Sequence, residues 1–277
     1  MSRVIMVTSF KGGVGKTTVS ANLSMSLAQM GYKVAAIDCD IESRCLDIML
    51  GLEDASLYNI CDVLNGSKTL DDVIVRDIRC DNLSFIAAPA YFSFADKEKE
   101  LPFNEKQVEQ FILELKKRFD FVILDLPARP DGLYKTLVQY SNFALVVSLH
   151  TAASIRAAEK TAMTIEDLVE NSENTVNFGR NLKTRLVINC FHAKDVIDGV
   201  RPSIYDIINK VSVKLIGVLP YDSGMSKGQE LGLLAYQVKH GKTPFYAAIN
   251  NTAKRCTEKS VPLLENVKLD VNKSRLS

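Results

Sequence analysis

A glycine-rich loop near the start of the chain constrains the fold more than any other feature. Residues Phe10–Thr18 read FKGGVGKTT and lie between a short apolar run, Val4–Ser9, and an amphipathic stretch, Thr17–Met30. Glycines let a backbone close around an anion without Cβ clashes, and the N–H groups of the loop and of the following helix then point at that anion. A strand–loop–helix unit of this composition predicts a phosphate-binding site.

The residues of this loop have separate expected roles. Lys16 would place its charge between the β- and γ-phosphates of a nucleotide, Thr17 would bind Mg²⁺ through its hydroxyl, and Thr18 would donate to the α-phosphate. The loop residues expected to supply backbone contacts are Gly12, Gly13, Val14 and Gly15. The usual phosphate-loop pattern has glycine at the position that Phe10 occupies in this chain.

Short apolar runs alternate with amphipathic stretches along the rest of the chain. The expected strands are Val4–Ser9, Lys33–Asp38, Leu83–Ala87, Phe121–Asp125, Ala144–Leu149, Arg185–Asn189 and Leu215–Leu219. The expected helices are Thr17–Met30, Asn104–Arg118, Ser154–Glu170, Ile204–Val211 and Phe245–Cys256. Strands that are apolar throughout are buried on both faces, which is typical of a parallel sheet covered by helices. We therefore predict an α/β fold with a doubly wound, mostly parallel sheet, helices on both faces, and ligands at the carboxyl ends of the strands.

Composition and charge set the broad class of the protein. The formal net charge of the 277 residues is +1, which is too small by itself to indicate a nucleic-acid or membrane partner. The six cysteines include no CxxC pair, as is expected in a reducing cytosol. The chain opens without a signal-peptide pattern, and its apolar runs are far below the about 18 residues of a membrane span. We expect a cytoplasmic protein.

Three aspartates that follow expected strands are candidate metal or water ligands. Asp125 ends a hydrophobic strand, as the acid of a nucleotide-binding site does, and would hold Mg²⁺ through a water molecule. Asp38 and Asp40 end another strand, and carboxylates two residues apart on a strand project to the same side. One of them would hold metal-bound water while the other orients an attacking water. The alternative is that both only cap the following turn. The metal candidates are Thr17, Asp38 and Asp125.

Lys11 adds a specific resemblance. A lysine that opens the loop, as in KGGxGKT, is the deviant form found in the MinD/ParA family of P-loop ATPases. The chain resembles the MinD branch of this family from about residue 3 to residue 255, in segments that include Leu46–Asp54 (LDIMLGLED), Asp81–Pro89 (DNLSFIAAP) and Lys214–Asp222 (KLIGVLPYD). The resemblance implies a Mg-dependent ATP hydrolase, slow until a partner stimulates it, with a P-loop ATPase domain over residues 1–258 and a tail over residues 259–277.

The resemblance also implies roles for single residues. Lys11 would reach across an ATP-sandwich homodimer to the partner's phosphates, acting in catalysis with Lys16, and Asp40 would orient the attacking water. Similar proteins place an asparagine and a P-x-D turn around adenine, although such residues can also merely cap a strand or turn the chain. The matching residues are Asn189, Pro220, Tyr221 and Asp222. Arg129 stands where the family's D-x-P-A-G switch has glycine, and it either alters γ-phosphate sensing or supplies a charge of its own.

The expected function follows from the same resemblance. It is a MinD-like ATPase that cycles between an ADP monomer and an ATP dimer and positions the bacterial division site through membrane and partner binding. The alternatives are a ParA-type DNA-binding partition ATPase and an ATP-dependent adaptor in flagellar or pilus assembly. The tail has one weak apolar stripe, but Pro262, two acids and the lack of Phe or Trp argue against a strong membrane helix. Reversible peripheral binding at the inner membrane and an ordinary C-terminus therefore both stay open.

Overall fold

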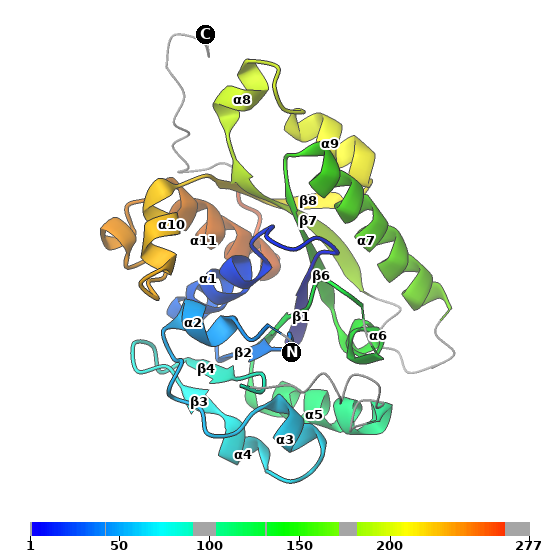
Figure 1. Cartoon of the computed structure of the whole chain (residues 1–277), viewed down its shortest axis with the longest axis vertical. Coiled ribbons are helices and arrows are strands. Elements are labelled where there is room, and N and C mark those ends of the chain that lie inside the picture. Colours follow the sequence, from blue (N-terminus) through cyan, green and yellow to red (C-terminus); the bar gives the residue numbers. More distant parts are fainter. Residues whose placement is uncertain (1, 42, 91–103, 131, 172–181, 264–277) are drawn as a thin grey trace.

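A single mostly parallel sheet forms the centre of the molecule (Figure 1). The computed structural model describes residues 2–41, 43–90, 104–130, 132–171 and 182–263. In this part of the chain eight strands lie in the order β3-β4-β2-β5-β1-β6-β7-β8, with β3 antiparallel to β4 and every other pair parallel. The strands are β1 Arg3–Thr8, β2 Val34–Asp38, β3 Val75–Arg76, β4 Leu83–Ile86, β5 Phe121–Asp125, β6 Phe143–Leu149, β7 Lys183–Phe191 and β8 Lys214–Pro220. The predicted α/β, doubly wound fold is confirmed.

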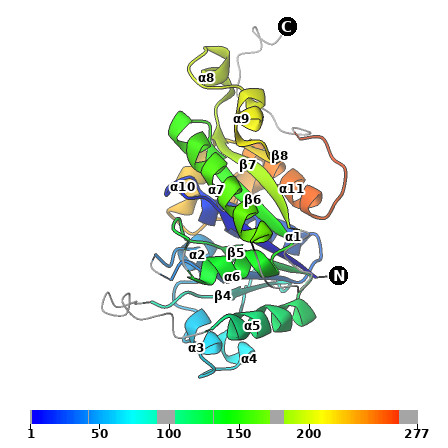
Figure 2. The same ribbon diagram turned by 90° about the vertical axis from the view of Figure 1, so that its right-hand side faces the viewer.

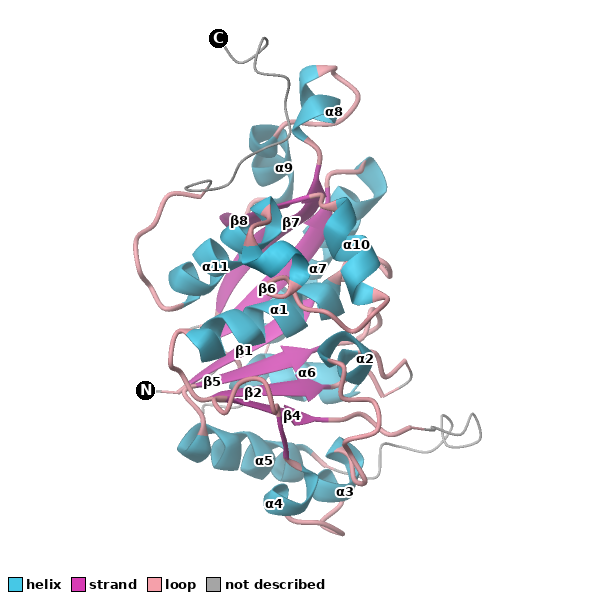
Figure 3. Cartoon of the chain, turned by 90° about the vertical axis from the view of Figure 1, so that its left-hand side faces the viewer, coloured by secondary structure: helices cyan, strands magenta, loops and turns pink. Residues whose placement is uncertain are grey.

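Helices cover both faces of the sheet. The described helices are α1 Lys16–Gln29, α2 Leu46–Leu50, α3 Ile60–Leu64, α4 Leu70–Val73, α5 Glu105–Arg118, α6 Gly132–Tyr140, α7 Ala152–Glu170, α8 Ala193–Ile197, α9 Ile204–Val211, α10 Ser223–Gln229 and α11 Pro244–Cys256, with a 3₁₀ turn at Val238–Gly241. Helices α5, α6 and α7 lie on one face (Figure 2), and α1, α2, α10 and α11 lie on the other (Figure 3). No helix of the described residues is both long enough and apolar enough to span a bilayer.

Strand β1 shows why the central strands are apolar without alternation. Val4 and Met6 belong to the core on the α5–α7 face, whereas Ile5 and Val7 belong to the core on the α1 face. All four side chains are fully buried. Because successive side chains of a strand point to opposite faces, a strand covered on both sides must be apolar at every position.

Local capping fixes where several helices begin. Asn104 and Gln107 form a reciprocal capping box at the start of α5, and Ser203 and Asp206 form another at the start of α9. Helix α11 begins with Pro244 directly after the capping residue Thr243. The predicted bounds of α9 and β5 agree with the structure, and the other predicted elements differ by one or two residues at one or both ends.

The shortest elements have no sequence pattern that predicts them. Strand β3 has two residues, and α2, α3, α4 and α8 have four or five, which is too short for hydrophobic periodicity to register. The longer helices α6 and α10 were also missed. In the predicted tail, residues 264–277 lie outside the described residues, so the expectation of an amphipathic helix there stays a prediction.

The order of the strands places the ligand site at the carboxyl end of β1. The chain runs from β1 to β2, β3 and β4 on one side of β1, returns to β5 between β2 and β1, and then crosses to β6, β7 and β8 on the other side. Such a reversal of strand order leaves a crevice at the carboxyl ends of the strands, where α/β proteins bind ligands. The glycine-rich loop leaves β1 at this point and enters α1.

Candidate nucleotide-binding site

The glycine-rich loop is held in shape from outside by Asn189. Gly15 precedes α1 and has φ +89°, a left-handed conformation that side chains rarely adopt. A Cβ placed on Gly15 would lie 2.2 Å from the Asn189 Nδ2 atom. Asn189 lies in β7 and donates a hydrogen bond from Nδ2 to the carbonyl oxygen of Val14 at 2.9 Å. The sequence predicts Asn189 beside the base, which stays a prediction; the structure shows that its amide binds the loop backbone.

Two aspartates lie side by side at the edge where this loop opens. Asp38 ends β2 and Asp125 ends β5, and the two are paired residues of neighbouring parallel strands. Both side chains are buried, and burial raises the pKa of both carboxyls above the ordinary value, as does the proximity of the two charges for Asp38. Asp125 accepts a hydrogen bond from the Ser20 hydroxyl at 2.8 Å, and the nearby Thr17 hydroxyl acts against burial by lowering the pKa of Asp125.

Lys16 lies among these carboxylates. It is the first residue of α1 and is partly buried. Burial lowers the pKa of the Lys16 ammonium, and the nearby charges of Asp125 and Asp40 act in the opposite direction. Lys11 is partly buried at the start of the loop and forms no ion pair with the residues that the structure describes. The described residues form no ion pair with Lys16 either, so the loop has two lysines whose charges are available to an anion.

Asp38 and Asp40 have different surroundings, although both follow β2. The Asp38 carboxylate accepts backbone N–H groups of Asp40, Cys45 and Leu46 at 3.0, 3.1 and 3.0 Å. Asp38 therefore caps the turn that leads into α2, which is the alternative role considered above. Asp40 is partly buried in that turn, and its Oδ1 accepts the N–H of Ser43 at 3.1 Å. Its second carboxylate oxygen has no hydrogen bond to a described residue, which leaves an acceptor for water.

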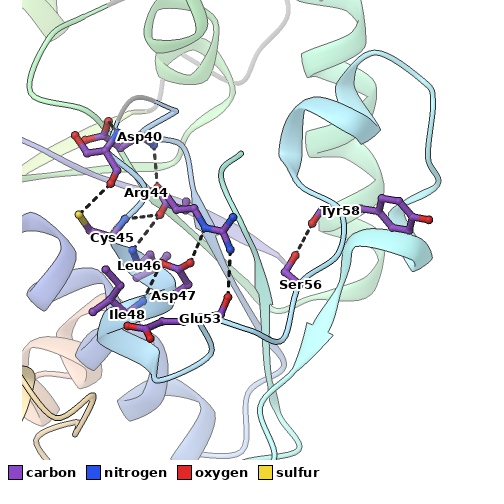
Figure 4. Close-up of polar contacts among 11 residues, drawn as sticks. Asp40, Arg44, Cys45, Leu46, Asp47, Ile48, Glu53, Ser56 and Tyr58 are labelled. Atoms are coloured by element: carbon purple, nitrogen blue, oxygen red, sulfur yellow. Dashed lines mark hydrogen bonds and ion pairs between the residues drawn. The ribbon is translucent and has the colours of Figure 1, made fainter. Parts of the chain in front are cut away.

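Arg44 fixes the far end of the same turn (Figure 4). It has φ +35°, and its guanidinium forms an ion pair with Asp47 at 2.5 Å and reaches the carbonyl oxygen of Glu53 at 3.4 Å. The N–H of Arg44 donates to the carbonyl oxygen of Asp40 at 3.0 Å. No motif indicated this residue, because its role depends on the fold of one turn.

A pocket of about 200 Å³ extends from the loop toward the ends of β7 and β8. The pocket is lined by all four residues predicted near the base and by four residues of the loop: Asn189, Pro220, Tyr221, Asp222, Gly13, Val14, Gly15 and Thr18. Residues that the sequence analysis missed also line it: Cys190, Met225, Ser226, Gln229 and Phe245. Met225 and Phe245 are buried apolar side chains that carry no recognisable motif. A larger pocket, of about 430 Å³, lies between α7 and α9, but it has neither the loop nor the paired aspartates.

The P-x-D turn shapes this pocket through the backbone. Pro220 ends β8, and the N–H of Tyr221 donates to the carbonyl oxygen of Phe191 at 3.0 Å. Asp222 caps α10 by accepting the N–H of Gly224 at 2.8 Å. The ring of Tyr221 stacks on His192, with 4.4 Å between the ring centroids. The pocket wall is therefore fixed by a helix cap and an aromatic stack.

The segment after β5 departs from the expected switch in one residue. The N–H of Leu126 donates to the carbonyl oxygen of Val7 at 3.1 Å, so this segment stays beside the start of the loop. Pro127 and Ala128 are partly buried and Arg129 is exposed. Arg129 forms no ion pair with the described residues.

Together, the glycine loop between β1 and α1, the paired acids at the ends of β2 and β5, and the adjoining pocket define a P-loop nucleotide-binding protein. A family model described as an AAA domain (AAA_31) matches residues 2–178. The septum site-determining protein MinD of Bacillus subtilis (strain 168) is 34% identical over 264 residues, covering 95% of this chain and 92% of that protein. MinD of Synechocystis is 32% identical over 269 residues, covering 96% and 93%.

Solved structures agree with this assignment. The MinC:MinD cell division protein complex of Aquifex aeolicus superposes with a TM-score of 0.80 at 30% identity, covering 95% of this chain and 98% of that chain. MinD of Aquifex aeolicus superposes with a TM-score of 0.78 at 28% identity, covering 95% and 99%. The chain belongs to the MinD/ParA family of P-loop ATPases and is a MinD-type division-site ATPase.

Proposed function

We propose that this ATPase is a nucleotide-driven switch that uses Mg-ATP binding and slow hydrolysis to select the division site. One observation carries the proposal: the helix that begins with Lys16 is joined to the paired acids, because Ser20 of α1 donates to Asp125 at 2.8 Å and Asp125 lies opposite Asp38. A cation, a buried acid and a partly exposed acid at the end of a phosphate loop are the parts that phosphoryl transfer to water requires.

The residues at this edge suit a magnesium ion. Mg²⁺ prefers oxygen ligands and is usually bound through one or two carboxylates together with substrate phosphates. The Thr17 hydroxyl lies close enough to Asp125 to influence the pKa of that carboxyl, and Asp38 is paired with Asp125 on the neighbouring strand. Thr17 would bind the ion directly, and Asp125 and Asp38 would hold it through water. Bound there, Mg²⁺ would neutralise charge on the phosphates.

Hydrolysis then depends on charge stabilisation and on the placing of one water molecule. Lys16 would bind the β- and γ-phosphates, and Lys11 would supply a second positive charge across a dimer. Asp40 would orient the attacking water through the carboxylate oxygen that no described residue occupies. By similarity to the family, basal turnover would be slow and a protein partner would stimulate it.

We further propose that ATP closes two copies into a sandwich and that ADP releases them. Lys11 is partly buried, lies at the loop mouth and has no ion-pair partner within the described residues, so its charge is available to a phosphate in a second copy. The Aquifex aeolicus structure is a complex of MinD with MinC. By similarity, this chain would bind a protein partner of the division-site system, and its dimer would be the form that binds.

Light scattering with ATP and with ADP would test the switch. Wild-type protein should be dimeric with Mg-ATP and monomeric with Mg-ADP. Lys11→Ala should bind ADP normally and stay monomeric, because it lacks only the charge supplied in trans. Asp40→Ala should bind ATP and accumulate as a dimer, because it cannot orient water. Normal turnover in Asp40→Ala would remove Asp40 from the mechanism, and an ATP monomer in the wild type would remove the sandwich.

Sedimentation with anionic liposomes would test the membrane part. The comparison is between the full chain and a truncation after Lys259, each with ATP and with ADP. Sedimentation of the full chain with ATP, lost on truncation, would support reversible membrane binding through the tail. No sedimentation with either nucleotide would move the target to DNA or to a protein scaffold, and DNA binding that falls as salt rises would identify the former.

A further inference from the structure

A side chain from α10 contacts the phosphate loop at Thr18, beside the pocket that adjoins the loop. Gln229 ends α10, and its Nε2 donates a hydrogen bond to the Thr18 hydroxyl oxygen at 2.7 Å. The two residues are 211 positions apart in the chain. Both line the pocket of about 200 Å³ beside the loop. No motif and no role in the mechanism above accounts for Gln229.

Gln229 is held on a supported segment. Asp222 caps the first turn of α10, one end of the segment. At the other end, Asn22 accepts the N–H of Ala235 at 2.7 Å and donates to the carbonyl oxygen of Thr18 at 2.9 Å. Asn22 is buried, so these bonds are shielded from water. The Gln229 side chain therefore reaches Thr18 from an element that is tied to α1 independently.

The direction of this hydrogen bond sets the direction of the next one. A threonine hydroxyl has one hydrogen to donate and two lone pairs to accept with. The Gln229 N–H fills a lone pair of Thr18, so the hydroxyl hydrogen remains available to the pocket. A hydroxyl that accepts a hydrogen bond is also a better donor, because consecutive hydrogen bonds polarise one another.

We infer that Gln229 is a positioning residue for the α-phosphate of the bound nucleotide, acting through Thr18. It orients the Thr18 hydroxyl so that its hydrogen donates to an α-phosphate oxygen, and it strengthens that bond without touching the phosphate. The inference rests on the proposed function, because it requires a nucleotide in this site. It assigns to α10 a part in nucleotide affinity rather than only in covering the sheet.

Calorimetric titration of the full chain with Mg-ADP would test this role. The variants are Gln229→Met, which keeps the length and removes the donor, and Gln229→Glu, which can only accept. Gln229→Met should weaken ADP binding about three- to tenfold, as expected for loss of one positioned hydrogen bond. Gln229→Glu should weaken it more, because the carboxylate takes the Thr18 hydrogen and adds negative charge near the phosphate. The exposed neighbour Glu230→Gln is the matched control and should bind as the wild type does.

A double-mutant cycle distinguishes positioning from a purely structural tie. Thr18→Val removes the hydroxyl, so Gln229→Met should cause no further loss of ADP affinity in that background. Thr18→Ser keeps a hydroxyl, so in that background Gln229→Met should again weaken ADP binding by most of the factor seen in the wild type. An equal loss in the presence and absence of the hydroxyl would overturn the inference, as would wild-type affinity in Gln229→Met. Urea unfolding without nucleotide would establish that each variant is folded. A wild-type chain that does not bind Mg-ADP would instead refute the proposed function itself.

Discussion

Replacing Gly15 with alanine would test how the phosphate loop is held. The residue has φ +89°, and a left-handed conformation costs an alanine about 1–2 kcal/mol. The new methyl group would lie 2.2 Å from the Asn189 Nδ2 atom, which must move and release its hydrogen bond to Val14. Leaving those buried groups unpaired costs about 1–3 kcal/mol. We expect Gly15→Ala to lower the free energy of unfolding by about 2–5 kcal/mol in total.

Urea denaturation of the nucleotide-free protein measures this loss. Total stabilities of such domains are about 5–15 kcal/mol, so the variant should fold but unfold at clearly lower urea. Gly12→Ala is the matched control, because no atom lies within 4 Å of a Cβ built there, and it should change stability by less than about 0.5 kcal/mol. In an Asn189→Ala background the clash is gone, so Gly15→Ala should cost only the backbone strain. An equal cost in both backgrounds would refute the idea that Asn189 holds the loop.

Three further predictions concern other parts of the molecule. Asn22→Ala should lower the free energy of unfolding by about 1–3 kcal/mol in urea, because it leaves the N–H of Ala235 without its acceptor, whereas Asn22→Asp keeps that acceptor and should lose less. Asp222→Ala removes the cap of α10 and should cost about 1 kcal/mol and weaken ADP binding, with Asp222→Asn near wild type in both assays. Burial raises the pKa of Cys256 to about 12, so iodoacetamide near neutral pH should label Cys256 only after unfolding, while the partly exposed Cys80 reacts in the folded protein. Peptide mass spectrometry would detect either result, and labelling of folded Cys256 would contradict its burial.

The fold could be predicted from the sequence because its long elements are locally specified. A two-sided parallel sheet requires strands that are apolar without alternation, and the run Phe121–Leu124 shows this pattern directly before Asp125. The loop Phe10–Thr18 carries its chemistry in consecutive residues, so its place between a strand and a helix could also be read directly. Strand β3, with two residues, has no pattern of its own and forms only because β4 lies beside it.

The site was only partly predictable, for a different reason. Asp38 and Asp125 could be recognised because each follows a strand, but their pairing depends on β2 lying next to β5. Gln229, Met225 and Phe245 line the pocket and follow no motif, since their positions depend on how α10 and α11 pack. From the sequence, Asp38 and Asp40 look like an equivalent pair of carboxylates. In the structure the buried Asp38 caps a turn, whereas the Asp40 side chain is partly exposed.

The sequence by itself determined the kind of chemistry and the kind of fold. Both are written in short stretches, as glycines and lysine within one loop and as unbroken apolar runs, and local sterics and hydrophobicity suffice to interpret them. Only the tertiary structure decided which distant residues act on that loop, such as Asn189 on the Val14 carbonyl and Gln229 on the Thr18 hydroxyl. These contacts join residues more than 170 positions apart, and hydrogen bonds at that separation depend on the packing of the whole sheet.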